Sequence, residues 1–133
     1  FLAPQQMKSL VKKVEDSGNH NIMLTDRGVS FGYNNLVVDF RAIPIMKEFG
    51  YPVVFDATHS VQMPGSNGDS TGGDRRFVPT LANAAMAAGA DVLFFEIHPE
   101  PDKALCDGAN MLALNDAKKV FEKCKAIFEL VRE

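Results

Sequence analysis

Polar and ionisable side chains close three short apolar runs of this sequence. The three closing groups are Asp26 with Arg27, Asp56 to His59, and Glu96 to His98. If the runs form parallel strands, their carboxyl ends meet at one edge of a sheet, where the active-site groups of α/β proteins gather. Strand ends are also wetter than strand middles, so a purely structural interpretation stays open for each residue. Taken together, the three groups predict a catalytic edge.

A metal site is one reading of His59, Glu96 and the loop residue Asp107, which together offer one imidazole and two carboxylates. That set suits a borderline divalent metal, and three protein ligands leave room for substrate or water. Alternation along extended strands would place Glu96 and His98 on one face, and His59 on the face opposite Asp56. The separations along the chain are long, so the spacing by itself is not specific for a metal.

Arg27 follows the first apolar run directly and precedes Gly28. A guanidinium presents forked donors that match phosphate or carboxylate, which makes Arg27 a candidate anion clamp. A salt bridge at the rim of the sheet would suit the same position.

The segment 60–76 is long for a simple connection and contains four glycines: Gly65, Gly68, Gly72 and Gly73. It lacks the order of Gly, Lys and Ser/Thr that defines a phosphate-binding P-loop. We interpret it as a lid over the site, with a flexible loop that touches no ligand as the alternative.

Periodicity predicts the elements that must position these groups. Helices are expected at about 4–17, 43–49, 77–88 and 116–132, the last with Asn115 as its N-cap, and strands at 21–25, 52–59 and 91–98. Residues 28–41 look irregular. Near-continuous apolar strands separated by helices indicate an α/β fold with a parallel sheet. Three parallel strands and about four helices make a poor closed unit, but they suit part of a (β/α)8 TIM barrel or, less well, of an open doubly wound sheet.

Composition narrows the function classes. The 133 residues suffice for one domain, and a net charge of −3 gives no electrostatic reason to expect nucleic acid or an anionic membrane as partner. No apolar run approaches the ~20 residues that span a bilayer. The two cysteines, in a chain without a signal peptide, suggest reduced thiols and a cytoplasmic location. The sequence opens at Phe1 without an initiator Met, so we expect a piece of a longer protein.

Four motifs resemble the 3-deoxy-D-manno-octulosonate 8-phosphate synthases in order and spacing. They are Asp26-Arg27-Gly28-Val29-Ser30-Phe31-Gly32-Tyr33-Asn34-Asn35-Leu36-Val37-Val38-Asp39, Phe55-Asp56-Ala57-Thr58-His59-Ser60-Val61-Gln62, Glu96-Ile97-His98-Pro99-Glu100-Pro101, and Cys106-Asp107-Gly108. The resemblance covers nearly the whole chain. It implies that residues 1–133 are the C-terminal part of a (β/α)8 barrel, the second half of a single catalytic domain. It also implies condensation of phosphoenolpyruvate with arabinose 5-phosphate in bacterial lipopolysaccharide biosynthesis.

The same resemblance implies roles for individual residues. Arg27 would hold the phosphate of phosphoenolpyruvate, and His59 would lie beside that substrate. In the metal-dependent class, His59, Glu96 and Asp107 would bind a divalent metal such as Zn, Fe or Mn; the metal-independent class needs none. The position that separates the classes, Cys or Asn on the first strand, lies outside this sequence. His59 and Asp107 are the catalytic candidates, and a homo-tetramer is the implied assembly.

Two other functions remain open from the sequence. The related 3-deoxy-7-phosphoheptulosonate synthases use erythrose 4-phosphate as acceptor, and sugar choice depends largely on residues outside this chain. The alternative from another class is an inactive fragment that acts only as a structural or assembly module.

Overall fold

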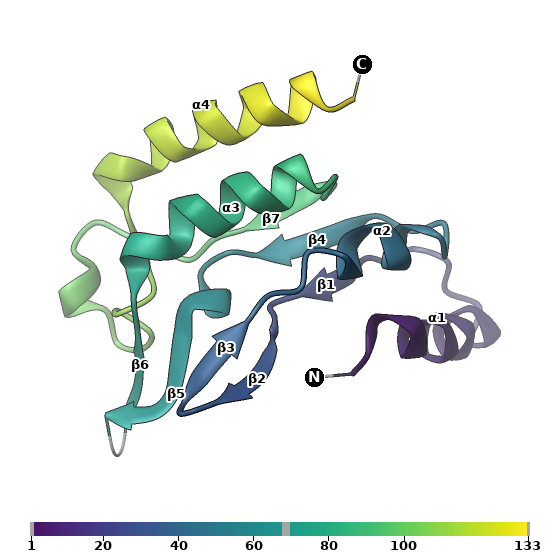
Figure 1. The fold of residues 1–133 in the computed structure, drawn as a ribbon, viewed down its shortest axis with the longest axis horizontal. Coiled ribbons are helices and arrows are strands. Elements are labelled where there is room, and N and C mark those ends of the chain that lie inside the picture. The colour runs from purple at the N-terminus through teal and green to yellow at the C-terminus, as the bar shows by residue number, and fades with distance from the viewer. Residues whose placement is uncertain (1, 68–69, 133) are drawn as a thin grey trace.

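A three-stranded parallel sheet organises the fold. The computed structural model describes residues 2–67 and 70–132. The strands are β1 (Leu24–Asp26), β4 (Val53–Asp56) and β7 (Val92–Phe94), in the order β1–β4–β7. Asp26 is in register with Phe55, and Asp56 with Phe94, so the carboxyl ends of all three strands lie at the same edge (Figure 1). The expected α/β class is confirmed, and the sheet is consistent with part of a TIM barrel.

Four α-helices lie among the described residues, as expected. They are α1 (Met7–Asp16), α2 (Ala42–Lys47), α3 (Val78–Ala87) and α4 (Leu114–Leu130), and the 3-10 turn η1 (Pro4–Gln6) leads into α1. The helix α4 begins at Leu114 with Ala113 as its N-cap, so the prediction of Asn115 as cap was wrong. No helix of the described chain is both long and apolar enough to cross a membrane.

The core surrounds β4, whose four residues are all buried. Val53 and Phe55 are fully inaccessible, and they share the core with Ile43 from α2 and Val78 from α3. Burial along the whole strand is typical of a parallel strand covered on both faces, which explains its uninterrupted apolar sequence. Farther out, α3 packs against α4, and the two helices run side by side above β7 in Figure 1.

Residues 28–41 contain a β-hairpin, so the prediction of an irregular segment was wrong. The strands β2 (Val29–Gly32) and β3 (Asn35–Val37) pair antiparallel, with a bulge in β2. The two residues at the tip, Tyr33 and Asn34, have φ values of 51° and 58°. Positive φ at both central residues is the geometry of a tight hairpin turn, and Asn adopts it more readily than most residues.

The predicted lid segment 60–76 is also largely regular. The 3-10 turn η2 (His59–Val61) leads into β5 (Gln62–Asn67), which pairs antiparallel with β6 (Ser70–Gly73), and the 3-10 turn η3 (Arg75–Phe77) enters α3. Gly68 and Asp69 of the segment lie outside the described residues. A hairpin therefore stands after β4, at the edge where the strands end (Figure 1).

The third predicted strand, 91–98, is divided in two. After β7 the chain leaves the main sheet, and β8 (Ile97–His98) pairs instead with β9 (Leu112–Ala113). The connection between β8 and β9 holds the 3-10 turn η4 (Pro101–Lys103) and the loop that carries Asp107. This break moves Glu96 out of the strand, so the alternation expected for Glu96 and His98 does not apply.

Candidate active site

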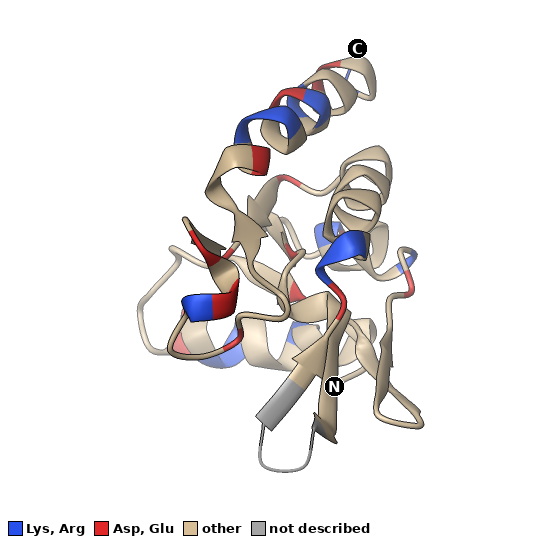
Figure 2. Cartoon of the chain, turned by 90° about the vertical axis from the view of Figure 1, so that its left-hand side faces the viewer, with Lys and Arg blue, Asp and Glu red and all other residues tan. Residues whose placement is uncertain are grey.

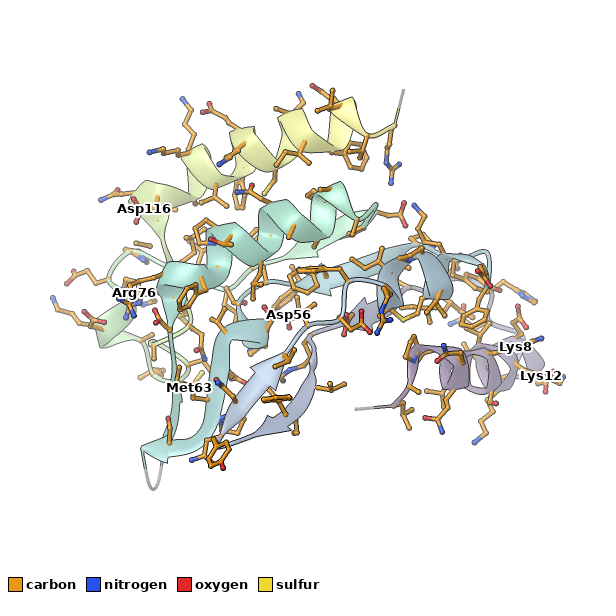
Figure 3. All side chains as sticks on the ribbon, in the orientation of Figure 1. Lys8, Lys12, Asp56, Met63, Arg76 and Asp116 are labelled. Carbon is orange, nitrogen blue, oxygen red and sulfur yellow. The ribbon has the colours of Figure 1, made fainter. Side chains whose placement is uncertain are left out.

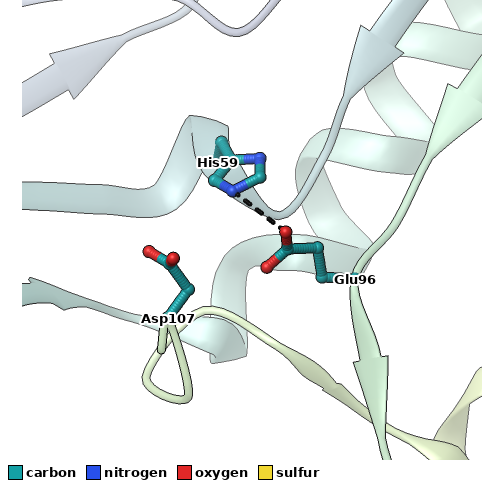
Figure 4. Close-up of side chains that lie close together, drawn as sticks. All are labelled: His59, Glu96 and Asp107. Atoms are coloured by element: carbon teal, nitrogen blue, oxygen red, sulfur yellow. Dashed lines mark ion pairs between the residues drawn. The ribbon is translucent and has the colours of Figure 1, made fainter. Parts of the chain in front are cut away.

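His59, Glu96 and Asp107 converge at the carboxyl edge of the sheet. One potential ligand atom from each lies within 4.8 Å of the other two, and all three side chains are partly buried. The Nε2 atom of His59 lies 3.5 Å from Oε1 of Glu96, and a dashed line marks this contact in Figure 4. The second carboxylate oxygen of Glu96 is buried and has no hydrogen-bond partner among the described residues. One imidazole and two carboxylates thus face a common point, which is a donor set suited to a divalent cation.

Asp56 orients the imidazole of His59. Its Oδ2 lies 2.6 Å from Nδ1 of His59, and its Oδ1 accepts the backbone N–H of His59 at 3.0 Å. A carboxylate accepts hydrogen bonds, so Nδ1 carries a proton toward Asp56, and Nε2 is the ring nitrogen that faces Glu96. The prediction that Asp56 and His59 point to opposite faces was wrong, because β4 ends at Asp56 (Figure 3) and His59 opens the turn η2.

Thr58 ties the ends of two neighbouring strands together. Its fully buried hydroxyl donates to Oδ1 of Asp56 at 3.3 Å and accepts the backbone N–H of Glu96 at 3.1 Å. The Asp56 carboxylate and the Glu96 backbone are therefore fixed relative to one another. His98 takes no part in this group: its Nδ1 accepts the backbone N–H of Glu100.

Asp107 is presented by a tight turn. Its φ is 51°, and its carbonyl accepts the backbone N–H groups of Asn110 and Met111. A Cβ on the next residue, Gly108, would lie 2.3 Å from the carbonyl oxygen of Pro101, so only glycine fits there. The side chain of Asp107 also raises the pKa of the neighbouring Cys106 thiol by hydrogen bonding, which keeps that sulfur protonated at neutral pH.

Arg27 reaches the same group from the end of β1. Its Nη2 donates to Oε1 of Gln62 and, at 3.4 Å, to the carbonyl of His59. The amide of Gln62 in turn donates to Oδ1 of Asp107 at 2.6 Å. Nε of Arg27 is buried without a hydrogen-bond partner in the described part of the chain. A guanidinium therefore lies next to the His59, Glu96 and Asp107 group, where it can face an anion.

The neighbouring Asp26 has a different task. Its Oδ1 accepts the backbone N–H of Gly28 at 2.9 Å, which stabilises the turn between β1 and the β2–β3 hairpin. Burial raises the pKa of the Asp26 carboxyl.

Two side chains that contact this group, Gln62 and Asp56, were not predicted from the sequence. Gln62 was not a candidate because its spacing from Arg27 and Asp107 carries no recognisable pattern. Asp56 was noted as a polar strand end, but its pairing with His59 depends on the turn η2, which strand alternation does not predict.

Away from this group, charges of both signs are mixed on the surface: Lys and Arg are interspersed with Asp and Glu along α4 in Figure 2.

The chain belongs to the DAHP synthetase I family, which it matches over residues 1–133. Among curated relatives, the chain is similar to the 2-dehydro-3-deoxyphosphooctonate aldolases of three bacteria. Identity is 58% over 132 residues for Pelobacter propionicus (strain DSM 2379 / NBRC 103807 / OttBd1), covering 99% of this chain and 48% of the relative.

The chain is 56% identical over 133 residues to the relative from Geobacter sp. (strain M21), covering 100% of this chain and 49% of the relative. It is 57% identical over 130 residues to the relative from Nitratidesulfovibrio vulgaris (strain DP4), covering 98% of this chain and 48% of the relative. The chain thus spans about half the length of the curated relatives it matches.

Proposed function

We propose that residues 1–133 form the second half of the catalytic domain of a 3-deoxy-D-manno-octulosonate 8-phosphate synthase. The enzyme would condense phosphoenolpyruvate with arabinose 5-phosphate and release inorganic phosphate, in bacterial lipopolysaccharide biosynthesis and in the cytoplasm. The observation that carries this proposal is the convergence of Arg27, His59, Glu96 and Asp107 at one edge of a parallel sheet. The shared name of the relatives, 2-dehydro-3-deoxyphosphooctonate aldolase, supports the eight-carbon product.

Arg27 is the proposed clamp for the phosphate of phosphoenolpyruvate. Its guanidinium is held at the strand ends by Gln62 and the carbonyl of His59, and its Nε still lacks a partner in the described chain. A charged donor that is partly removed from water binds an anion more strongly than an exposed one, because the surrounding dielectric is lower. Holding phosphoenolpyruvate here would place it beside His59.

The chemistry forms one carbon–carbon bond. The double bond of phosphoenolpyruvate attacks the aldehyde carbon of the sugar, water adds at the adjacent carbon that bears the phosphate, and the phosphate leaves with its bridging oxygen. In this scheme His59 and Asp107 would be the catalytic groups. When no metal is bound, Nε2 of His59 is the ring nitrogen able to take a proton from water or give one to the new hydroxyl, since Nδ1 is committed to Asp56.

A divalent metal fits the donor set of His59, Glu96 and Asp107, because their ligand atoms lie within 4.8 Å and Glu96 keeps a buried oxygen without a partner in the described chain. Zn, Fe or Mn bound there would orient the sugar or the water by charge. Asp56 would keep His59 in the tautomer that a metal requires. A homo-tetramer, expected from the family resemblance, is part of the same proposal.

Comparing sugar phosphates tests this function. The full-length protein that carries these residues should release phosphate from phosphoenolpyruvate with arabinose 5-phosphate, and far more slowly with erythrose 4-phosphate. The relatives' name disfavours the seven-carbon reaction. Preference for erythrose 4-phosphate, or no condensation with either sugar, would overturn the proposal.

A further inference from the structure

The amide of Gln62 stands between the proposed anion clamp and the proposed metal group. Its Oε1 accepts from Nη2 of Arg27, and its Nε2 donates to Oδ1 of Asp107 at 2.6 Å. Only 9% of Gln62 is exposed. We infer that Gln62 is a positioning residue that couples anion binding at Arg27 to metal binding at Asp107. This inference rests on the proposed function, and it adds a link between two halves of that site.

The orientation of the amide follows from its neighbours. A guanidinium has donors only, so the carbonyl oxygen of Gln62 must face Arg27. The NH2 group then faces Asp107, where an ionised carboxylate accepts it. Rotating the amide by half a turn would set donor against donor at Arg27 and acceptor against acceptor at Asp107. The charges at its two ends therefore hold Gln62 in one orientation.

The backbone of Gln62 is also fixed. Gln62 follows the turn η2, and its N–H donates to the carbonyl of His59. It pairs with Gly73 at the base of the β5–β6 hairpin. The same carbonyl of His59 accepts from Arg27 at 3.4 Å. Arg27, Gln62 and His59 are thus joined by both side-chain and backbone bonds, which leaves the guanidinium little freedom to move alone.

Coupling follows from this chain of contacts. An anion that draws the guanidinium of Arg27 changes its bond to Gln62, and the amide transmits that change to Oδ1 of Asp107. One carboxylate oxygen of Asp107 lies within 4.8 Å of a ligand atom of His59 and of one of Glu96, so a cation held by the three would contact the same carboxylate. A bound phosphate should therefore tighten cation binding, and by reciprocity a bound cation should tighten phosphate binding.

The test measures Mn²⁺ affinity of the full-length protein by titration, with and without phosphoenolpyruvate, and repeats it with inorganic phosphate. We expect either anion to raise Mn²⁺ affinity about tenfold in the unmodified protein. In Gln62→Met, which keeps the side-chain length but removes both amide contacts, the increase should fall to nearly none. Gln5→Met, at an exposed glutamine of η1, is the matched control and should retain the full increase.

Each outcome decides something different. An undiminished increase in a folded Gln62→Met protein overturns the coupling role and leaves the proposed function standing. Absence of Mn²⁺ binding, or no effect of either anion on the unmodified protein, also overturns the coupling, and this measurement does not require the variant to fold. Failure to bind phosphoenolpyruvate at all overturns the proposed function and the coupling together.

Discussion

At the scale of single residues, Arg27 is the side chain proposed to contact the substrate directly. Arg27→Ala in the full-length protein should weaken phosphoenolpyruvate binding about 100-fold, because charge-assisted hydrogen bonds contribute about 1.5–3 kcal/mol each. Arg27→Lys keeps the charge without the fork and should recover part of the loss. Calorimetric titration with phosphoenolpyruvate measures both. An unchanged affinity in Arg27→Ala would remove this residue from the clamp.

Asp56 acts on the metal group only through His59. Asp56→Asn should lower metal affinity about 10–100-fold, since the amide supports the imidazole tautomer less firmly than a carboxylate does. His59→Ala should abolish binding if the enzyme is metal-dependent. Asp116→Asn, at an exposed carboxylate of α4, is the control. Titration with Zn²⁺ distinguishes the variants, and equal affinities of Asp56→Asn and the unmodified protein would show that Asp56 does not orient the ligand.

The candidate residues were visible in the sequence, but their contacts were not. Apolar runs ending in polar residues indicated where Arg27, His59 and Glu96 would gather. The prediction that His59 and Asp56 point to opposite faces was wrong, because alternation assumes a strand that in fact stops at Asp56. Gln62 could not be found because the direction of its amide depends on two charges brought together by the fold.

At the scale of elements, Gly28 sets the path from β1 into the β2–β3 hairpin. Its φ is +80°, and an added Cβ would lie 2.7 Å from the carbonyl oxygen of Val37 in β3. Gly28→Ala should therefore lower the free energy of unfolding by about 3 kcal/mol, from left-handed strain together with a backbone clash. Urea denaturation measures the change.

Gly18→Ala is the matched control for this prediction. Gly18 has a similar φ of +88°, but no atom lies within 4 Å of its added Cβ. Gly18→Ala should lower the free energy of unfolding only through the left-handed strain, by about 1 kcal/mol. Equal losses at the two positions would mean that the close approach of Val37 costs nothing.

The helices and the hairpins differ in how far the sequence predicts them. Helical periodicity over ten or more residues places α1, α3 and α4 to within a few positions. The hairpins β2–β3 and β5–β6 have short strands and mostly exposed or glycine-rich sequences, so no apolar alternation marks them. Their pairing is set by turn geometry and by neighbouring elements, such as Gly73, where any Cβ would collide with the buried Asn110.

At the scale of the whole molecule, Asp91 joins three elements at the opposite end of the sheet. Its carboxylate accepts the backbone N–H of Val53 at the start of β4 and pairs with Lys47 of α2 and with Arg132, which follows α4. Burial alone would raise the pKa of Asp91, but these three donors outweigh it, so the pKa lies below the usual 3.8. Its ionised form therefore stabilises the folded state.

The stabilisation by Asp91 should depend on pH. A lowered folded-state pKa means that the contribution is present above pH 3.8 and is lost as the pH falls through the lower, folded-state value. Asp91→Asn should cost about 1 kcal/mol at pH 7 and progressively less below pH 3.8. Glu48→Gln, at an exposed carboxylate, is the control. Urea unfolding at several pH values measures this, and a penalty that is constant with pH would contradict it.

The two outer strands of the sheet each have an edge without a partner strand among the described residues. Within the described chain, β1 and β7 each pair only with β4, and on β7 the side chains of Val92 and Phe94 are 38% and 45% exposed. A closed barrel would cover such edges, whereas open edges invite association with other strands. If residues 1–133 are half of one catalytic domain, the isolated chain should show no condensation of phosphoenolpyruvate with arabinose 5-phosphate.

Refolding the isolated chain with the remaining half of the domain should then restore turnover and return the protein to a single defined assembly. Light scattering follows association, and phosphate release follows activity. A chain that acts only as an assembly module would regain a defined size without turnover. Turnover by the 133 residues alone would show that the edges of β1 and β7 need no further strands to complete the site, which would overturn the half-domain proposal.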